Sequence, residues 1–139
     1  MKNYLKIILI ALFAILVLPR CTKFPVDEDG LLITGRAECY VSNFEIVGTD
    51  YQSVRTNNAA NPMVIDTVNC TIKVEVYYGT DLKNLYPQFT LVNDAKLEPK
   101  VTGFTDFSDL NNPKKYTVIS GNHLVRKTYT LTITVQQKP

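Results

Sequence analysis

The chain has 139 residues, a length that fits one domain of ordinary size together with an N-terminal leader. Its 15 basic and 13 acidic side chains give a formal net charge of +2. Lys2, Lys6 and Arg20 belong to the leader, so the rest of the chain carries 12 basic and 13 acidic residues, a net charge of −1. Because phosphate binding needs a clustered excess of Lys and Arg, we expect no nucleic-acid partner.

The N-terminus has the pattern of an export signal. Lys2 and Lys6 precede an unbroken apolar run, Ile7 to Leu18. The run fits the roughly 7 to 15 residues of a signal-peptide core and is shorter than the roughly 18 residues that span a bilayer. Residues 1–20 are therefore predicted to be a signal peptide, and the protein is expected to be exported.

Cys21 follows the apolar run, with Leu18 three residues before it. This arrangement resembles a bacterial lipoprotein signal, in which the cysteine becomes the first mature residue and carries the lipid. Pro19 and Arg20 depart from the small residues that such signals prefer. We expect lipid attachment at Cys21 to hold the protein to the outer membrane, so that the membrane is a partner; an uncleaved membrane helix and plain secretion are the alternatives.

Residues 21–37 are predicted to form a flexible tether. They contain the acidic run Asp27-Glu28-Asp29. A short acidic stretch after the cysteine resembles the surface-export tag of Bacteroidota lipoproteins. The other interpretation is a solvated stretch with no further role.

Cys39 and Cys70 are the two remaining cysteines, and an exported protein folds where disulfides can form. An antiparallel pairing of the strand around Phe44 with the strand around Ile65 would set these cysteines opposite each other. We therefore predict a candidate disulfide between Cys39 and Cys70. The alternative is two buried free thiols that pack as small apolar residues.

The first strand is predicted over residues 40–47, where Phe44 and Ile46 point to the inner face. Residues 48–62 follow and contain three Asn but no clear period, so we expect a long exposed loop. Loops of this length are usually functional or disordered. Both interpretations, a recognition loop and a disordered segment, stay open.

A second strand is predicted to start near Met63 and to run to Tyr77. Its apolar residues share one face and are Cys70, Ile72, Val74 and Val76. Gly79 then breaks the strand. Leu82 and Leu85 are expected on a single helical or 3₁₀ turn that Pro87 ends.

The rest of the chain predicts further short strands. Residues 89–91 alternate, and residues 96–101 read as an edge strand because Pro99 interrupts them. Residues 116–118 and 128–135 are the last two strands. The inner face of the final strand is formed by Tyr129, Leu131, Ile133 and Val135.

This series of short strands, with turn signals at intervals of about ten residues and no helical period after the leader, predicts an all-β fold. We expect an Ig-like antiparallel β-sandwich of about seven strands over residues 38–139. An N-terminal signal or anchor helix and the flexible tether precede it.

Several of these segments together resemble a known family. The residues that carry the likeness are Tyr78-Gly79-Thr80-Asp81-Leu82, Asp106-Phe107-Ser108, Tyr116-Thr117-Val118 and Lys127-Thr128-Tyr129-Thr130-Leu131. They resemble an Ig-like domain of unknown function found in surface lipoproteins of Bacteroidota, often ahead of a domain assigned to carbohydrate metabolism. The resemblance implies a glycan-associated setting on the outer surface and no particular mechanism.

Two further expectations follow from this resemblance. The chain ends at Pro139, where such proteins commonly continue, so it is either a stand-alone module or the truncated front of a larger carbohydrate-metabolism lipoprotein. Asp66-Thr67-Val68 resembles the O-glycosylation sites of these bacteria, which makes Thr67 a candidate for modification.

No catalytic constellation is visible in the sequence. The single histidine, His123, falls in a predicted hairpin turn, and no zinc or nucleotide motif is present. We therefore expect no catalytic residue, no cofactor and no metal site. Asp106 and Asp109 could bind calcium, but two carboxylates in a turn-rich segment more often form turns.

Exposed tyrosines are the best candidates for ligand contact, because aromatic rings stack on sugar faces. Tyr77, Tyr78 and Tyr40 are predicted as candidate glycan contacts, and Tyr51 and Tyr86 are expected near loop ends. The function expected is a non-enzymatic surface module, a spacer or interaction domain with a glycan or a protein as partner. The alternative is a carbohydrate-binding module that uses the tyrosines.

Overall fold

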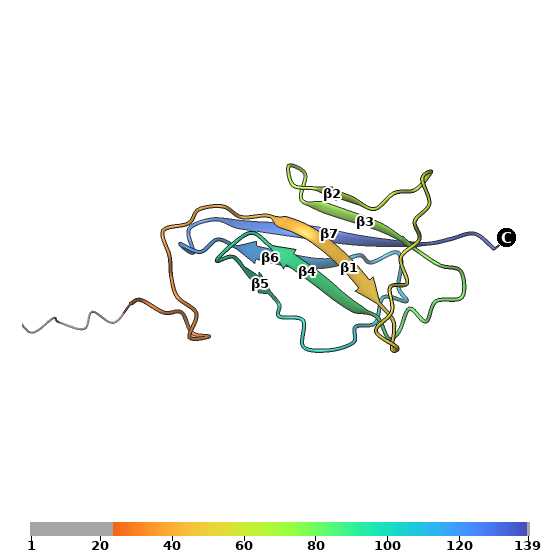
Figure 1. Ribbon diagram of the computed structural model, residues 1–139, viewed down its shortest axis with the longest axis horizontal. Coiled ribbons are helices and arrows are strands. Elements are labelled where there is room, and N and C mark those ends of the chain that lie inside the picture. Colours follow the sequence, from red (N-terminus) through yellow and green to blue (C-terminus); the bar gives the residue numbers. More distant parts are fainter. Residues whose placement is uncertain (1–23, 139) are drawn as a thin grey trace, which may run out of the picture.

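The computed structural model describes residues 24–138 (Figure 1). Its strands are β1 (Val41–Val47), β2 (Val64–Asp66), β3 (Thr71–Val76), β4 (Tyr86–Leu91), β5 (Lys96–Glu98), β6 (Lys114–Ile119) and β7 (Arg126–Val135). They form a five-stranded sheet in the order β2-β3-β7-β6-β5 and a two-stranded sheet of β1 and β4. The predicted all-β sandwich of about seven strands is confirmed.

The sequence predicts an antiparallel sandwich, but one pair of neighbouring strands is parallel. β3 and β7 run parallel, with Ile72 opposite Leu131 and Val74 opposite Ile133. After β3 the chain crosses to the other sheet as β4, returns to the five-stranded sheet as β5, and reaches the position beside β3 through the β6–β7 hairpin. Alternation along a strand indicates which face is buried, but it does not indicate which strand lies alongside.

The stretch expected to run as one strand from residue 63 to residue 77 is in fact β2 and β3, joined by a turn. Asp66 closes the turn, because its carboxylate accepts hydrogen bonds from the backbone N–H groups of Val68 and Asn69 and from the Asn69 side chain. Cys70 adopts a φ of 53° at the end of the turn and lies outside β3.

Leu82 and Leu85 do not form a helical turn, and Pro87 does not end one. Pro87 lies inside β4, opposite Ile46. β4 is an edge strand of a two-stranded sheet, where a residue without an N–H group is tolerated. Leu85 is fully buried and pairs through its backbone with Thr105.

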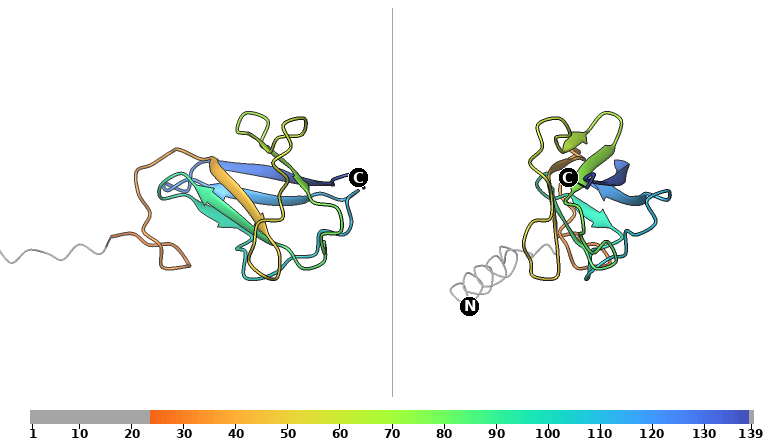
Figure 2. Two further views of the ribbon diagram at one scale, coloured as in Figure 1. Left: turned by 45° about the vertical axis from the view of Figure 1, so that its right-hand side comes forward. Right: turned by 90° about the vertical axis from the view of Figure 1, so that its right-hand side faces the viewer.

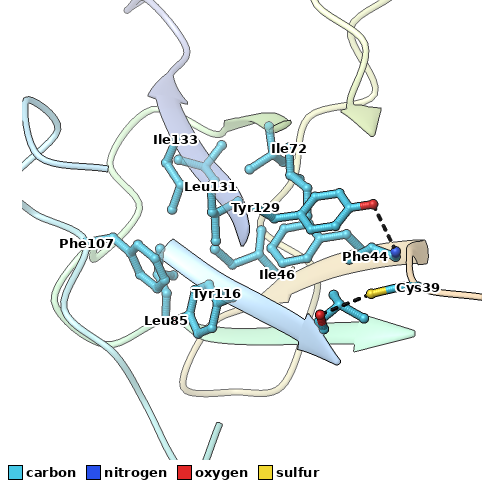
Figure 3. Packing of buried hydrophobic residues seen from close by; sticks show 14 residues of the cluster. Cys39, Phe44, Ile46, Ile72, Leu85, Phe107, Tyr116, Tyr129, Leu131 and Ile133 are labelled. Carbon is cyan, nitrogen blue, oxygen red and sulfur yellow. Dashed lines mark hydrogen bonds between the residues drawn. The ribbon is translucent and has the colours of Figure 1, made fainter. Parts of the chain in front are cut away.

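The core lies between the two sheets (Figure 3). Ring contacts connect the sheets: Phe44 packs edge-on against Phe89 at 4.9 Å between centroids, and Phe89 packs against Tyr116 at 4.7 Å. The inner-face residues predicted for the first, second and last strands are buried, apart from Cys70 and Val135, which are partly buried. Each such side chain stabilises the fold by roughly 1.5 to 3 kcal/mol.

The strand pairing on which we based the disulfide prediction is wrong. β1 pairs with β4, so Phe44 lies opposite Phe89 and not opposite Ile65. Cys39 and Cys70 are free thiols. The buried Cys39 Sγ donates to the Val118 carbonyl at 3.1 Å, and burial raises the pKa of this thiol, so Cys39 packs as a small, unreactive core residue.

The loop over residues 48–63 is held in place by β3. The Glu75 carboxylate accepts hydrogen bonds from Thr56 Oγ1 at 2.8 Å, from Asn61 Nδ2 at 2.9 Å and from Asn58 Nδ2 at 3.4 Å. The hydrogen bond from Thr56 is the main reason that the pKa of Glu75 is lowered. The loop is therefore ordered, which argues against the disordered interpretation, while the recognition role stays a prediction.

Residues 24–37 are not the flexible tether that we predicted. Residues 24–33 form a small N-terminal hairpin, in which Val26 pairs with Leu32. The Asp27 carboxylate, only 4% exposed, accepts a hydrogen bond from Lys96 Nζ at 2.8 Å, and Lys100 Nζ lies 2.8 Å from Asp29. The hydrogen bond from Lys96 is the main reason that the pKa of Asp27 falls to about 2. Two residues of the acidic run, Asp27 and Asp29, are therefore docked on the domain, while Glu28 is exposed to solvent.

The sandwich has two distinct ends. The N-terminal hairpin and the β6–β7 turn lie at one end, which we call the N-terminal end; His123 Nε2 of that turn is 3.6 Å from Asp27. The C-terminus lies at the opposite end of the long axis (Figures 1 and 2). Residues 48–63, 77–85 and 99–113 also gather there, and we call it the loop end.

Candidate functional site

Three aromatic side chains meet at the loop end and form an aromatic cluster. The ring of Phe104 lies 5.8 Å from that of Tyr51 and 6.0 Å from that of Tyr86, measured between centroids. Tyr51 is 66% exposed, and Phe104 is also exposed. The rings thus come from three loops or strand ends and present aromatic surface to solvent.

Local backbone structure places each ring. Tyr51 sits in a tight turn at φ 59°, where its N–H bonds to the Gly48 carbonyl. Tyr86 begins β4. Phe104 is brought beside Tyr86 by a two-way backbone pairing between Leu85 and Thr105, at 3.2 Å and 2.7 Å.

Two open hollows adjoin the cluster and share Val101. The first has a volume of about 320 Å³ and lies between β4 and β5, lined by Tyr86, Gln88 and Leu97 among others. The second has a volume of about 420 Å³ and is lined by Phe104 with polar side chains. Together they form a shallow groove along the open edge of the sandwich. Its polar groups include Gln88, Lys100, Thr102, Thr105, Asn112 and Lys115.

The composition of the groove is suited to binding. Aromatic faces stack on flat, weakly polar surfaces, while amides, hydroxyls and ammonium groups hydrogen-bond at the rim. General acid–base catalysis needs a positioned group such as a carboxylate or an imidazole. Among the described residues, neither hollow is lined by an Asp, a Glu or a His.

The structure does not bring the predicted glycan contacts together. Tyr77 and Tyr78 follow β3 at the loop end and are exposed. Tyr40 is also exposed but precedes β1, so it lies at the other end of a strand of seven residues, roughly 20 Å away.

Sequence reasoning expected Tyr51 and Tyr86 near loop ends, but it gave Phe104 no assignment. The pairing of Leu85 with Thr105 sets Phe104 beside Tyr86, and it joins residues 20 positions apart. No local pattern in the sequence encodes such a contact.

The carboxylates considered for calcium form turns. Asp106 Oδ1 accepts from the Ser108 N–H at 2.8 Å, and Asp109 Oδ1 accepts from the Asn111 N–H at 3.2 Å. Hydrogen bonds from Ser108 lower the pKa of Asp106. Over residues 24–138, His, Cys, Asp and Glu side chains form no group of three that could hold a metal ion.

The remaining predicted sites are placed as follows. Thr67 lies in the β2–β3 turn, partly exposed, and its carbonyl accepts from Lys127 Nζ at 3.4 Å. Cys21 and the signal peptide, residues 1–20, lie outside the described residues. Within the part of the chain that is described, no helix is long and apolar enough to cross a membrane.

The fold is thus a seven-stranded β-sandwich of the Ig-like kind, with a shallow groove of aromatic and polar side chains along its open edge. The family model described as SGBP, N-terminal, matches residues 51–133, and the chain belongs to this family, the N-terminal domain of starch- and glycan-binding proteins. The protein is thus a glycan-associated module of Bacteroidota, located at the cell surface or outside the cell.

Solved structures with the same fold come from Bacteroides species. A "putative glycoside hydrolase" of Bacteroides thetaiotaomicron gives a TM-score of 0.55 at 24% identity, over 74% of this chain and 26% of that one. A DUF4623 family protein of Bacteroides eggerthii gives 0.52 at 17% identity, over 73% of this chain and 22% of that one. The chain thus spans about a quarter of the length of either protein. No curated protein matches it.

Proposed function

We propose that the protein is a non-enzymatic cell-surface module that serves as a spacer or interaction domain in a glycan-associated outer-membrane system. The position of its two ends carries this proposal. Residues 24–37 lie at one end of the long axis and the C-terminus at the other (Figure 1). When a chain enters a domain at one end and leaves it at the other, the domain separates the segments before and after it by its full length.

The spacer proposal includes an anchor, a lipid on Cys21 after removal of residues 1–20. We expect the protein isolated from its native membrane to begin at Cys21 and to carry the mass of a lipid there. Cys21→Ala removes the acceptor and should abolish the lipid, whereas Cys70→Ala should leave it in place. Peptide mapping by mass spectrometry checks both variants. An unmodified N-terminus at another residue would contradict the anchor and favour plain secretion or an uncleaved helix.

The same peptide map tests the modification proposed at Thr67. A glycan should add its mass to the peptide that contains Thr67, and Thr67→Ala should remove that mass. An unmodified Thr67 peptide from the native host would end this proposal without affecting the anchor.

A carbohydrate-binding module is the second candidate, and the aromatic cluster favours it. On a glycan array, the spacer function predicts no saturable binding by the purified protein. Binding that is lost in Tyr51→Ala would assign a glycan site to the cluster. Loss in Tyr77→Ala instead would assign the site to Tyr77 and Tyr78. Tyr40→Ala, at the other end of β1, is the matched control and should bind as the wild type does.

Two further results would change the proposed function. Hydrolysis of any glycan by the purified protein would contradict a non-enzymatic role. A reading frame downstream of the Pro139 codon that encodes a carbohydrate-related domain would make this chain the front end of a larger lipoprotein. The length of the two solved structures, about four times that of the matched region, is consistent with such an arrangement.

A further inference from the structure

The N-terminal hairpin turns one charged side chain inward and several large apolar side chains outward. The Asp27 side chain is buried against the sheet, while its acidic neighbours Glu28 and Asp29 are exposed, and the large apolar side chains of the hairpin also face solvent. The exposed fractions are 73% for Phe24, 56% for Val26, 49% for Leu31 and 48% for Leu32. Val26 and Leu32 lie directly opposite each other, so their side chains share a face, and the exposed Phe24 lies two residues before Val26.

This apolar surface is held rigidly on the domain. Asp27 is fixed by Lys96, and its Oδ1 also accepts from the N–H groups of Asp29 and Leu31, which shapes the hairpin turn. The hairpin therefore keeps its apolar side chains in place without burying them in the core.

The segment just after the hairpin is fixed as well. The Thr34 N–H bonds to the Gly121 carbonyl at 2.8 Å, and the Arg36 side chain pairs with Asp94 at 3.1 Å. A side chain at Gly121 would collide with Thr34 Oγ1 and the Asp94 Cβ, so the chain can approach this closely only because residue 121 is a glycine.

Most charges around the hairpin are paired; over residues 24–138, the exposed Glu28 of the hairpin turn is the acidic residue of the hairpin without an ion pair. Lys96 and Lys100 pair with Asp27 and Asp29, and Arg126 Nη1 pairs with Glu98 at 2.8 Å in the neighbouring strands. The exposed Leu124 of the β6–β7 turn lies at the same end. The N-terminal end therefore combines exposed apolar side chains with ion pairs that leave little net charge to repel a lipid surface.

We infer that this apolar surface lies in the lipid–water interface of the membrane to which the chain is anchored. The inference rests on the anchor proposed above. Phe24 comes three residues after Cys21, so an extended chain places it at most about 11 Å from an acylated cysteine. An apolar surface at this distance from a bilayer lowers its free energy by entering the boundary between headgroups and acyl chains. The fixed hairpin would then stand the sandwich on its N-terminal end, with the loop end facing away from the membrane.

Tryptophan fluorescence can test this directly, because the chain contains no Trp. The full chain, reconstituted through its own anchor into phosphatidylcholine vesicles, is compared with and without brominated acyl chains. A Trp in Leu32→Trp should show blue-shifted emission that brominated lipid quenches. The matched control is Tyr78→Trp, at an exposed position of the loop end, whose emission should stay at the wavelength found in water and unquenched.

Three results would overturn the inference. Unquenched emission from Leu32→Trp would place the hairpin in water. A blue shift that grows with protein concentration and is not quenched would show that a second copy covers the surface. Quenching of both variants would show that the domain lies flat on the bilayer. Co-flotation of each variant with the vesicles reports the anchor separately, so a failed anchor and a failed hairpin contact are distinguishable.

Discussion

Replacing Phe44 by alanine is expected to lower the free energy of unfolding by about 3 to 5 kcal/mol, the range for removing a buried phenylalanine. Phe44 is almost completely buried, and its ring packs edge-on against Phe89, which in turn contacts Tyr116. These three residues belong to β1, β4 and β6, so the alanine leaves a cavity between the two sheets. Equilibrium denaturation in urea measures the effect.

Tyr51→Ala is the matched control for Phe44→Ala. It also removes an aromatic ring, but from the exposed cluster, and should change the free energy of unfolding by no more than about 0.5 kcal/mol. Comparable losses in the two variants would mean that the aromatic cluster, and not the row of rings between the sheets, holds the sandwich together.

The buried faces of the strands could be predicted from the sequence, because alternation depends only on neighbouring residues. Ile72, Val74 and Val76 were assigned to the inner face in this way, and all three are buried. The neighbours of each strand could not be predicted. The assumed pairing of the strands around Phe44 and Ile65 led to a disulfide that the structure does not contain.

The N-terminal hairpin shows a second limit of sequence reasoning. An acidic run after a signal peptide has the composition of a solvated tether. Asp27 is nevertheless buried, because Lys96, a residue 69 positions away, supplies the opposite charge. A long-range partner of this kind offsets the cost of burying a carboxylate, and no local sequence pattern indicates which residue that partner will be.

The candidate site could be predicted from the sequence only in part. Tyr51 and Tyr86 were expected near loop ends because of the turns around them. Their meeting with Phe104 depends on a backbone pairing between two loops, which only the structure reveals. The loop end therefore offers aromatic surface to a ligand or partner, while the N-terminal end, in our proposal, rests on lipid.

Replacing Tyr129 by phenylalanine is expected to lower the free energy of unfolding by about 1 to 3 kcal/mol at neutral pH, the cost of leaving a buried donor unpaired. The fully buried Tyr129 hydroxyl accepts the Val41 N–H at 3.3 Å and so joins β7 to the start of β1 across the sandwich (Figure 3). Phenylalanine fills the same space but leaves this N–H without a partner. Urea denaturation at pH 7 measures the loss.

The same substitution should also change the response to alkali. Burial raises the pKa of Tyr129 above its ordinary value of 10.0, so the folded state binds the phenolic proton more tightly than the unfolded state does. The resulting stabilisation is complete below pH 10 and is lost as the pH rises through the folded-state pKa. Tyr129→Phe has no such group, so its stability should fall less steeply above pH 10 than that of the wild type.

Tyr78→Phe, at an exposed position, is the control and should follow the wild-type curve. Parallel curves for all three proteins would show that the Tyr129 phenol titrates alike in the folded and unfolded states.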